Sequence, residues 1–474
     1  MTTQPLRPAS AVPGSAGRRP SPARRPGSAE PPGPLAGTAE RSGPLADTAA
    51  AELDAMLAAA DQALAEGYRP DRRGRQPVHT VYVPADQFRP GLVPDWGRQA
   101  VQALESWAPD PAEFGVAMGI GSALAADVRS RVLAKLIAEP VEDLRLDFED
   151  GYHPRAGPGS DASAGTAEGA DGRAGAGAAE DADARAAAIA LAGAVASGEV
   201  PPFVGLRCKS LEPATRRRAI RTLDLFLASL LSCGPLPAGF VVTLPKVTSA
   251  DQVAAMAHLC DRLEQAHALT PGQLVFEVQV ETPQVILGAD GTAVVARCVH
   301  AARGRLTGLH YGTYDYSASL GIAAAYQSMA HPAADHARSV MQVAAAGTGV
   351  RLSDGSSNVL PVGSRDEVVA AWQLHSALVR RSLKRGFYQG WDLHPAQLAS
   401  RFAATYAFFR EGLAVTCARL SAYLGSAGPG LLEEPATARA LAGYLARGLD
   451  CGAISQREVA EIAGLDRTGL DGLR

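Results

Sequence analysis

Short apolar runs alternate with longer stretches of helical periodicity along most of the chain. The runs that predict strands cover residues 79–83, 144–148, 203–207, 240–244, 274–280, 306–311 and 388–393, with a weaker run at 359–362. This alternation is typical of parallel β/α architecture, and eight strands are the number that a closed barrel requires. An open doubly wound sheet alternates in the same way, so counting alone does not separate the two folds. The polar residues that follow the runs favour a TIM-type (β/α)8 barrel of class α/β.

Four regions of the chain differ from this pattern or interrupt it. Residues 1–46 are rich in proline and arginine, which predicts a disordered tail; the prolines disfavour the amphipathic helix of a transit peptide. An amphipathic helix at 47–67 opens the barrel region, 47–400. Residues 155–184 hold no side chain both larger and more apolar than alanine, which predicts a disordered insertion. Residues 401–474 predict a C-terminal helical extension that either caps the barrel mouth or forms a subunit contact.

Composition narrows the range of partners and compartments. Apolar residues make up 47% of the chain, enough for a large core, and the formal net charge of -4 gives no basic field to attract nucleic acid or an anionic membrane. The six cysteines form no CxxC pair, and we find no secretory leader, so we expect reduced thiols and a cytoplasmic protein. No apolar run approaches the roughly 20 residues that cross a bilayer. The sequence therefore predicts a soluble protein whose acidic or small ligand needs a local basic pocket.

Acidic residues end the second run. Asp147, Glu149 and Asp150 lie within four positions, and alternation places Asp147 and Glu149 on one face with Arg145. Carboxylates this close repel one another in an apolar surrounding, so they require cations, a metal ion or water. The alternative is an acidic helix N-cap paired with nearby arginines.

Basic residues end the next two runs. Arg207 supplies a planar fork suited to a substrate carboxylate or an enolate oxygen, and Lys246 supplies a point charge. Both could instead neutralise the acids of the second run. The two interpretations are compatible, because a site of paired charges is stable without its ligand.

A metal site is predicted from the fifth and sixth runs. Glu281 follows the fifth run, and Asp315 follows the sixth. Carboxylates at the ends of two adjacent parallel strands can meet one hard cation and leave room for water and a chelating substrate. Either acid alone is more often a helix cap or an ion-pair partner. His394 ends the eighth run. Three roles are open to it: binding substrate, orienting a ligand, or a hydrogen bond to the backbone at a turn.

Taken as a set, these motifs resemble the HpcH/HpaI aldolase and citrate lyase β-subunit family, which includes malyl-CoA lyase-like enzymes. In chain order the matching segments are 81–86 (VYVPAD), 147–150 (DFED), Arg207, 245–246 (PK), 281–282 (ET), 312–315 with 320–321 (LG), and 394–397 (HPAQ). The resemblance covers about residues 79–400. It implies a (β/α)8 barrel, Mg²⁺ or Mn²⁺ ligation by Glu281 and Asp315, substrate or enolate contact by Arg207, and acid or base roles near Glu149 and Asp150.

Two departures bear on the substrate. The keto-acid aldolases of that family place a histidine directly after the acidic strand, whereas Asp150 is followed by Gly151 and Tyr152 and the histidine, His153, comes later. The acidic strand therefore looks more like the citrate lyase and malyl-CoA lyase branch. We identify no coenzyme A site in the sequence, so a CoA thioester stays one substrate class beside free acids.

The resulting hypothesis is a Mg²⁺-dependent carbon–carbon lyase that works through a metal-stabilised enolate. Asp150 or a metal-bound water takes the hydroxyl proton, Glu149 orients Arg207 or that water, and Lys246 completes the catalytic set. Arg207, Thr282 and His394 bind the substrate, a small carboxylic acid or its acyl-CoA. The alternatives are a malate synthase-like condensation of an acyl-CoA with glyoxylate, and a non-catalytic barrel used for binding. We expect a homo-oligomer without nucleic acid or membrane partners.

Overall fold

The structure is a computed structural model that describes residues 44–68, 74–153, 170–425 and 434–474. The chain divides into two units, Met1–Ala63 and Leu64–Arg474. In the first unit the described part belongs to helix α1 (Pro44–Gly67), which begins three residues before the predicted start at 47. The remainder of the predicted tail lies outside the described residues.

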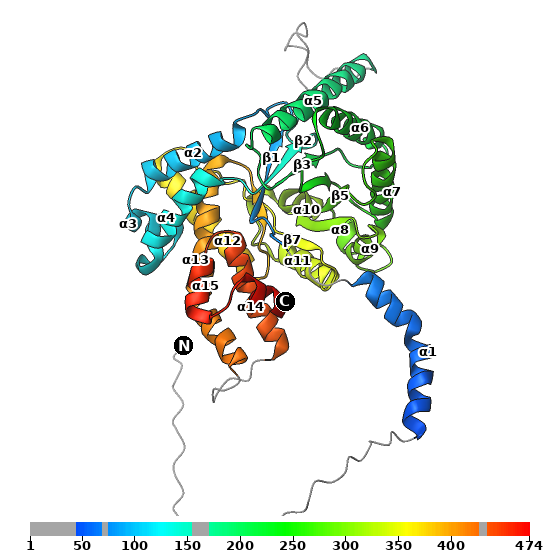
Figure 1. The fold of residues 1–474 in the computed structure, drawn as a ribbon. Coiled ribbons are helices and arrows are strands. Elements are labelled where there is room, and N and C mark those ends of the chain that lie inside the picture. The colour runs from blue at the N-terminus through cyan, green and yellow to red at the C-terminus, as the bar shows by residue number, and fades with distance from the viewer. Residues whose placement is uncertain (1–43, 69–73, 154–169, 426–433) are drawn as a thin grey trace, which may run out of the picture. The chain divides into compact units, whose positions relative to one another are not determined.

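Eight parallel strands form the centre of the second unit (Figure 1). They are β1 (His79–Pro84), β2 (Asp143–Asp147), β3 (Phe203–Arg207), β4 (Phe240–Leu244), β5 (Val275–Val280), β6 (Leu306–Tyr311), β7 (Arg351–Ser353) and β8 (Gly390–Asp392). Each strand pairs with its neighbour in the chain, and β8 pairs with β1. A parallel bridge from Ser353 to Gln389 joins β7 to the start of β8. The sheet therefore closes on itself, and the predicted (β/α)8 barrel is confirmed.

Helices follow the strands and surround them. In the order of the chain they are α2 (Leu92–Trp107), α3 (Pro111–Met118), α4 (Ser122–Ala138), α5 (Ala170–Ala196), α6 (Arg216–Cys233), α7 (Ala250–Ala266), α8 (Pro283–Ile286), α9 (Val294–Ala301), α10 (Thr313–Ser319), the 3-10 helix η1 (Ala324–Tyr326), α11 (Pro332–Ala345), α12 (Arg365–Lys384) and α13 (Pro395–Leu424). The outward positions of the strands, such as Leu144, Leu206 and Val278, are apolar and fully buried beneath these helices.

Two predictions along the chain are wrong. Residues 359–362 form no strand; β7 lies earlier, at Arg351–Ser353, and 354–364 is a loop. Residues 170–184 are not disordered but belong to α5, whereas 155–169 lie outside the described residues. Alanine has the highest helix propensity, and α5 buries Ala184 and Leu191 while Asp181 pairs with Arg218 and Arg221 of α6. Low apolar content therefore did not indicate disorder in this segment.

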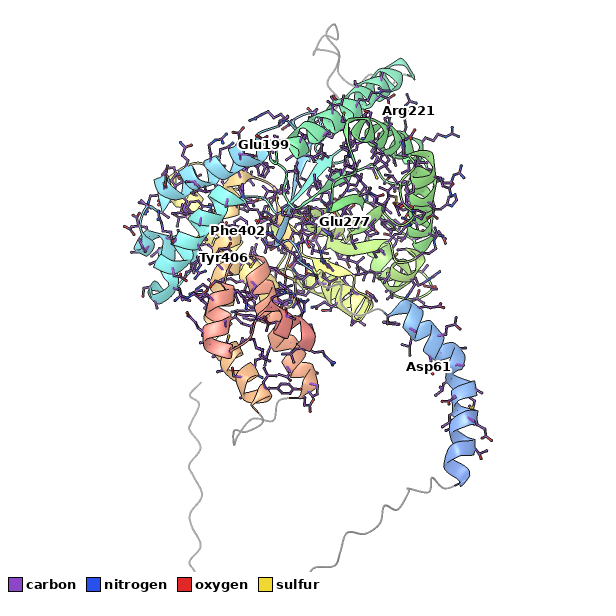
Figure 2. The ribbon with its side chains drawn as sticks, viewed as in Figure 1. Asp61, Glu199, Arg221, Glu277, Phe402 and Tyr406 are labelled. Carbon is purple, nitrogen blue, oxygen red and sulfur yellow. The ribbon has the colours of Figure 1, made fainter. Side chains whose placement is uncertain are left out.

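The barrel interior is polar. Arg145 on β2 donates from Nη2 to Glu277 Oε2 on β5 at 2.9 Å and pairs with Asp143, and Thr243 and His310 also contact Glu277. Because β2 and β5 are not neighbours in the sheet, these contacts cross the barrel, where Figure 2 labels Glu277. We call Asp143, Arg145, Thr243, Glu277 and His310 the core network. Burial acts to raise the pKa of Glu277, but Arg145 and His310 outweigh it and hold that pKa well below its usual range.

A cavity of about 370 Å³ opens beneath the core network at the amino-terminal end of the barrel. Its lining includes Asp143, Arg145 and Glu277. Both carboxylates already pair with Arg145.

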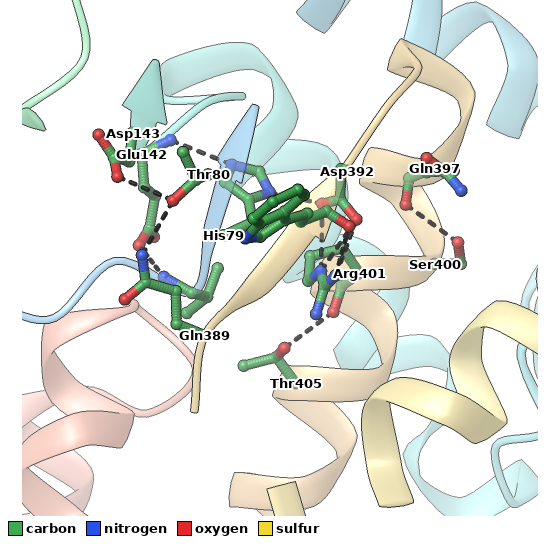
Figure 3. A network of polar contacts seen from close by, with 12 residues as sticks. His79, Thr80, Glu142, Asp143, Gln389, Asp392, Gln397, Ser400, Arg401 and Thr405 are labelled. Carbon is green, nitrogen blue, oxygen red and sulfur yellow. Dashed lines mark hydrogen bonds and ion pairs between the residues drawn. The ribbon is translucent and has the colours of Figure 1, made fainter. Parts of the chain in front are cut away.

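A second buried network joins α13 to the barrel (Figure 3). Asp392 on β8 accepts hydrogen bonds from His79 Nδ1 at 2.8 Å and from Arg401 Nη2 at 2.9 Å, and His375 Nε2 lies 3.2 Å away. Burial alone would raise the pKa of Asp392, yet Arg401 and the two histidines hold it well below its usual range. Arg401 therefore fixes the first turns of α13 to the eighth strand.

The C-terminal region is helical, as predicted. α13 continues into α14 (Pro435–Asp450), α15 (Gln456–Ala463) and α16 (Arg467–Leu473). The hydroxyl of Tyr406 on α13 donates to the carbonyl of Cys451, and Figure 2 places Tyr406 on that helix. Arg447 on α14 borders a cavity together with Gly349 and Leu352, which lie just before and within β7. These helices therefore pack near the amino-terminal ends of the strands and, within the described residues, do not cap the barrel mouth.

Two further sequence-based expectations can be compared with the described residues. All six cysteines lie among them and carry free thiols. In the described ranges, every helix is too short or too polar to traverse a lipid bilayer.

Candidate functional site

The candidate site lies at the carboxyl-terminal ends of five consecutive strands. Glu149 and Asp150 follow β2, Arg207 is the last residue of β3, and Lys246 comes two residues after β4. Glu281 follows β5 directly, and Asp315 lies in the first turn of α10 after β6. We call these six residues the mouth cluster. Parallel strands deliver their carboxyl ends to one rim, which is why residues spread over 167 positions can meet there.

The ammonium of Lys246 stands among four carboxylates. Its Nζ lies 2.8 Å from Asp315 Oδ2, 3.0 Å from Asp150 Oδ2, 3.7 Å from Glu149 Oε1 and 3.9 Å from Glu281 Oε1. Its backbone N–H also donates to Glu281 Oε1 at 2.7 Å. Lys246 adopts a φ of 53°, a left-handed conformation uncommon for residues other than glycine, at the turn that brings both groups to the acids. Negative charge therefore converges on one point.

Arg207 is held in a fixed orientation beside this point. Its Nε and Nη2 donate to the two oxygens of Asp147 at 2.6 and 2.5 Å, and the guanidinium carbon lies 4.8 Å from the ring centre of Tyr82. The remaining terminal nitrogen, Nη1, lies 3.3 Å from Glu149 Oε2 and 3.5 Å from Gln279 Oε1. Nη1 is thus the more loosely held end of the fork.

Two carboxyl groups of the mouth cluster have raised pKa values. Burial raises the pKa of Glu281 to about 7, against the opposing charges of Lys246 and Arg207. Burial, together with the nearby charge of Asp150, raises the pKa of Glu149 to about 8. Asp150 is more exposed than these two residues. Burial acts to raise its pKa, but hydrogen bonds with Glu149 and Lys246 outweigh burial and lower it. Near neutral pH the acids differ in protonation, a condition that acid–base chemistry needs.

A glycine makes room for the buried acid. A Cβ at Gly312 would stand 2.5 Å from the Cβ of Glu281 and 2.9 Å from its Oε2. Any side chain at this position would displace the carboxylate that the sequence predicts as a metal ligand. The end of β6 is therefore shaped around Glu281.

The donor set fits a hard divalent cation. Glu281 and Asp315 come from neighbouring strands, offer oxygen donors, and both lie within 4 Å of a single ammonium group. Mg²⁺ takes one or two carboxylates and completes its shell with water or substrate. Across the described residues, no cluster of three or more His, Cys, Asp or Glu side chains is arranged to bind a metal.

Two predicted substrate-binding residues are engaged elsewhere. The Thr282 hydroxyl donates to the carbonyl of Val247 at 2.5 Å, which ties the end of β5 to the loop after β4. His394 caps α13, where its Nδ1 accepts from the backbone N–H of Ala396 at 3.2 Å. This is the backbone-bonded role that the sequence left open for His394.

Sequence reasoning missed two residues that contact Arg207. Tyr82 stacks on the guanidinium, and Gln279 is fully buried with an Nε2 that has no hydrogen-bond partner. The signal was present in the alternation of the strands, because Tyr82 shares a face with Thr80, and Gln279 shares one with Glu277 and Glu281.

The fold and site define a class of protein: a parallel (β/α)8 barrel with a cluster of acidic and basic residues at the carboxyl ends of its strands. The chain belongs to the family described as a domain of unknown function, DUF6986, whose profile matches residues 57–176 and 168–474. No curated protein matches the chain in sequence.

Several solved structures are similar in part. Malate synthase of Haloferax volcanii in its magnesium/glyoxylate complex is 14% identical with a TM-score of 0.41, over 85% of this chain and 98% of that one. CitE of Mycobacterium tuberculosis, in complex with magnesium, acetoacetate and coenzyme A, is 17% identical with a TM-score of 0.41, over 83% and 100%. An HpcH/HpaI aldolase/citrate lyase family protein of Burkholderia cenocepacia is 16% identical with a TM-score of 0.35, over 74% and 98%. The last two carry the names of the family that the sequence motifs resemble; with TM-scores below 0.5, none of the three bears on the reaction.

Proposed function

We propose that this protein is a divalent-metal-dependent carbon–carbon lyase or synthase that acts on a 2-oxo or 2-hydroxy acid or its thioester. The observation that carries the proposal is the convergence of Glu281 and Asp315 on the position of the Lys246 ammonium. A cation is already stabilised at that point, and the carboxylates around it outnumber it.

Glu281 and Asp315 would hold Mg²⁺, or Mn²⁺ in its place. When bound, the metal would supply Lewis-acid stabilisation for the oxygens of a chelating acid. Lys246 would then balance the charge of Asp150, 3.0 Å from its ammonium, while Glu149 lies 3.7 Å away.

Arg207 would bind the oxygen on which negative charge develops. Cleavage of the bond between a hydroxylated carbon and its neighbour leaves the bonding electron pair on the neighbour as an enolate. Because Asp147 fixes Nε and Nη2, the Nη1 group is the one available to that oxygen. Tyr82 and Asp147 would keep the guanidinium from turning away, so this stabilisation requires no reorganisation during the reaction.

Asp150 and Glu149 would divide the proton transfers. Asp150 has a lowered pKa and is the more exposed, so it is ionised and can take the hydroxyl proton as the carbonyl forms. Glu149, with a pKa of about 8, is mostly protonated near neutral pH and can return a proton to the enolate carbon. The reverse sequence describes condensation, which the same residues can serve.

The test is turnover of short 2-oxo and 2-hydroxy acids and their CoA thioesters in both directions, with Mg²⁺ or Mn²⁺. We expect Glu281→Ala and Asp315→Ala to lose at least about a hundredfold in kcat/KM, as removal of a metal ligand or a comparable electrostatic group does. The control is Glu461→Ala, which removes an exposed acid of α15 that pairs with Arg457. Near-normal rates of both ligand variants with added metal would contradict the proposal.

A further inference from the structure

A set of apolar side chains is exposed on one side of the barrel mouth. They lie on the segments that follow β5, β6, β7 and β8 and are between 39% and 72% exposed. We call these six residues the apolar rim: Leu287, Leu320, Tyr326, Val359, Val362 and Leu393. Single exposed apolar residues are ordinary, but six on four consecutive strand ends of one mouth require an explanation.

Hydrogen bonds tie three of these segments together. The backbone N–H of Asn358, after β7, donates to the hydroxyl of Tyr314 on α10 at 2.5 Å. Gln397 donates to the carbonyl of Ser357 at 2.9 Å and accepts from the backbone N–H of Leu393 at 2.8 Å. The segments after β6, β7 and β8 thus form one connected surface.

Two residues of the apolar rim lie close in the chain to residues of the mouth cluster. Leu287 comes six residues after Glu281, and Leu320 comes five residues after Asp315 at the end of the same helix, α10. Five residues of helix rise about 7.5 Å, roughly the length of a chain of five or six carbons. A molecule bound at Glu281 and Asp315 can therefore reach Leu320 with its hydrocarbon chain.

Charge distinguishes this side of the mouth from the other. Residues 281–293, 312–331, 354–364 and 393–400 contain no lysine or arginine. On the other side, the segments after β3 and β4 carry Lys209, Lys246 and Arg216, with two more arginines directly after it. Phosphate groups need cationic partners, so the apolar rim suits an uncharged hydrocarbon and not the phosphate-bearing arm of a carrier.

We propose that the apolar rim binds the hydrocarbon part of the substrate, so that the preferred substrate is a 2-oxo or 2-hydroxy acid with an extended apolar chain. This inference rests on the proposed function, because it takes the carboxylate end of the substrate to be held at the mouth cluster. The rim then determines specificity through chain length.

The experiment measures binding of pyruvate, 2-oxobutanoate, 2-oxohexanoate and 2-oxooctanoate by calorimetry in the presence of Mg²⁺. Burying a methylene group is worth about 0.8 kcal/mol, so we expect affinity to rise up to about three- to fourfold per added carbon until the rim is covered. Leu320→Ser and Val359→Ser should flatten this dependence and leave the affinity for pyruvate unchanged. Val415→Ser is the control, because Val415 is also an exposed apolar residue but lies on α13, outside the mouth.

The outcomes separate the two proposals. Metal-dependent binding of pyruvate with no effect of chain length would overturn the inference about the apolar rim and leave the proposed function standing. Failure of every acid to bind with metal would overturn both. The apolar rim could instead be covered by a second copy of the chain, which analytical ultracentrifugation of the same variants tests. If Leu320→Ser or Val359→Ser turns an oligomer into a monomer, the rim is an interface between copies and the inference is wrong.

Discussion

The core network and the mouth cluster are both made of charged residues inside one barrel, yet they differ in how the charges are matched. In the core network Arg145 pairs with Asp143 and Glu277; the pKa of Glu277 is lowered, whereas burial raises the pKa of Asp143. In the mouth cluster four carboxylates share Lys246, and the pKa values of Glu149 and Glu281 are raised to about 8 and about 7. The charges of the core network are paired inside the barrel, whereas those of the mouth cluster are only partly neutralised and would be stabilised by the cation that we propose.

The largest expected effect is on the core network. Arg145→Met leaves Asp143 and Glu277 buried without their shared cation, so we expect the free energy of unfolding to fall by about 3–5 kcal/mol. Urea denaturation followed by circular dichroism measures it. Added Mg²⁺ should restore little of the loss, because both carboxylates are almost fully buried, although they border the cavity at the amino-terminal end. A loss below about 1 kcal/mol would show that the interior tolerates unpaired charge.

Lys246→Met is the matched change at the mouth cluster. Without its ammonium, Glu149, Asp150, Glu281 and Asp315 repel one another, and we expect the free energy of unfolding to fall by roughly 2 kcal/mol, less than for Arg145→Met because the lysine is half-buried. Here Mg²⁺ should raise the melting temperature of the variant more than that of the wild type, since it replaces the lost cation. Equal shifts in the two proteins would contradict a cation site at this position.

The third effect is a dependence of stability on pH. The folded protein retains a proton on Glu149 up to about pH 8, whereas the unfolded chain releases it near 4.5. The unfolded state therefore binds fewer protons in this window, and the free energy of unfolding should decrease as pH rises from about 4.5 to about 8. Glu149→Gln should remove the part of this decrease that comes from Glu149, on the order of 1 kcal/mol after allowance for solvent, and leave the part below about pH 7 that comes from Glu281. Thermal unfolding at pH 5, 6.5 and 8 gives the comparison; parallel curves would mean that Glu149 is ionised throughout.

The sequence predicted the barrel because its strands are apolar on their outer positions and end in polar residues. The mouth cluster could be predicted for the same reason, since Arg207, Lys246, Glu281 and Asp315 each follow a strand of recognisable pattern. β7 could not, because Arg351–Ser353 has only three residues and its pairing comes from β6 and not from its own apolar content.

The ion pairs of the core network could not be predicted from the local sequence pattern, for a different reason. Alternation places Arg145 on one face with Asp147, at the end of the same strand, and with Glu149 just after it, which suggested a partnership among them. Its partners are Asp143 below and Glu277, which lies 132 positions away across the barrel. Only closure of the sheet decides which layer a side chain meets, and that information is not local in the chain. The helix at 170–184 was missed because small alanine side chains can pack against a neighbouring helix at short distance. In addition, Asp181 of this helix pairs with Arg218 and Arg221 on α6.

The smallest expected effect would sharpen the comparison within the mouth cluster. Asp150 is more than half exposed, so Asp150→Asn should change the free energy of unfolding by less than about 0.5 kcal/mol despite the loss of an ion pair to Lys246. The same substitution removes a negative charge that, after burial, helps to raise the pKa of Glu149. The pH window of falling stability should therefore end at a lower pH in Asp150→Asn than in the wild type. An unmoved window would mean that burial alone sets the protonation of Glu149, and the two acids would then have to be treated as independent in any account of proton transfer at this site.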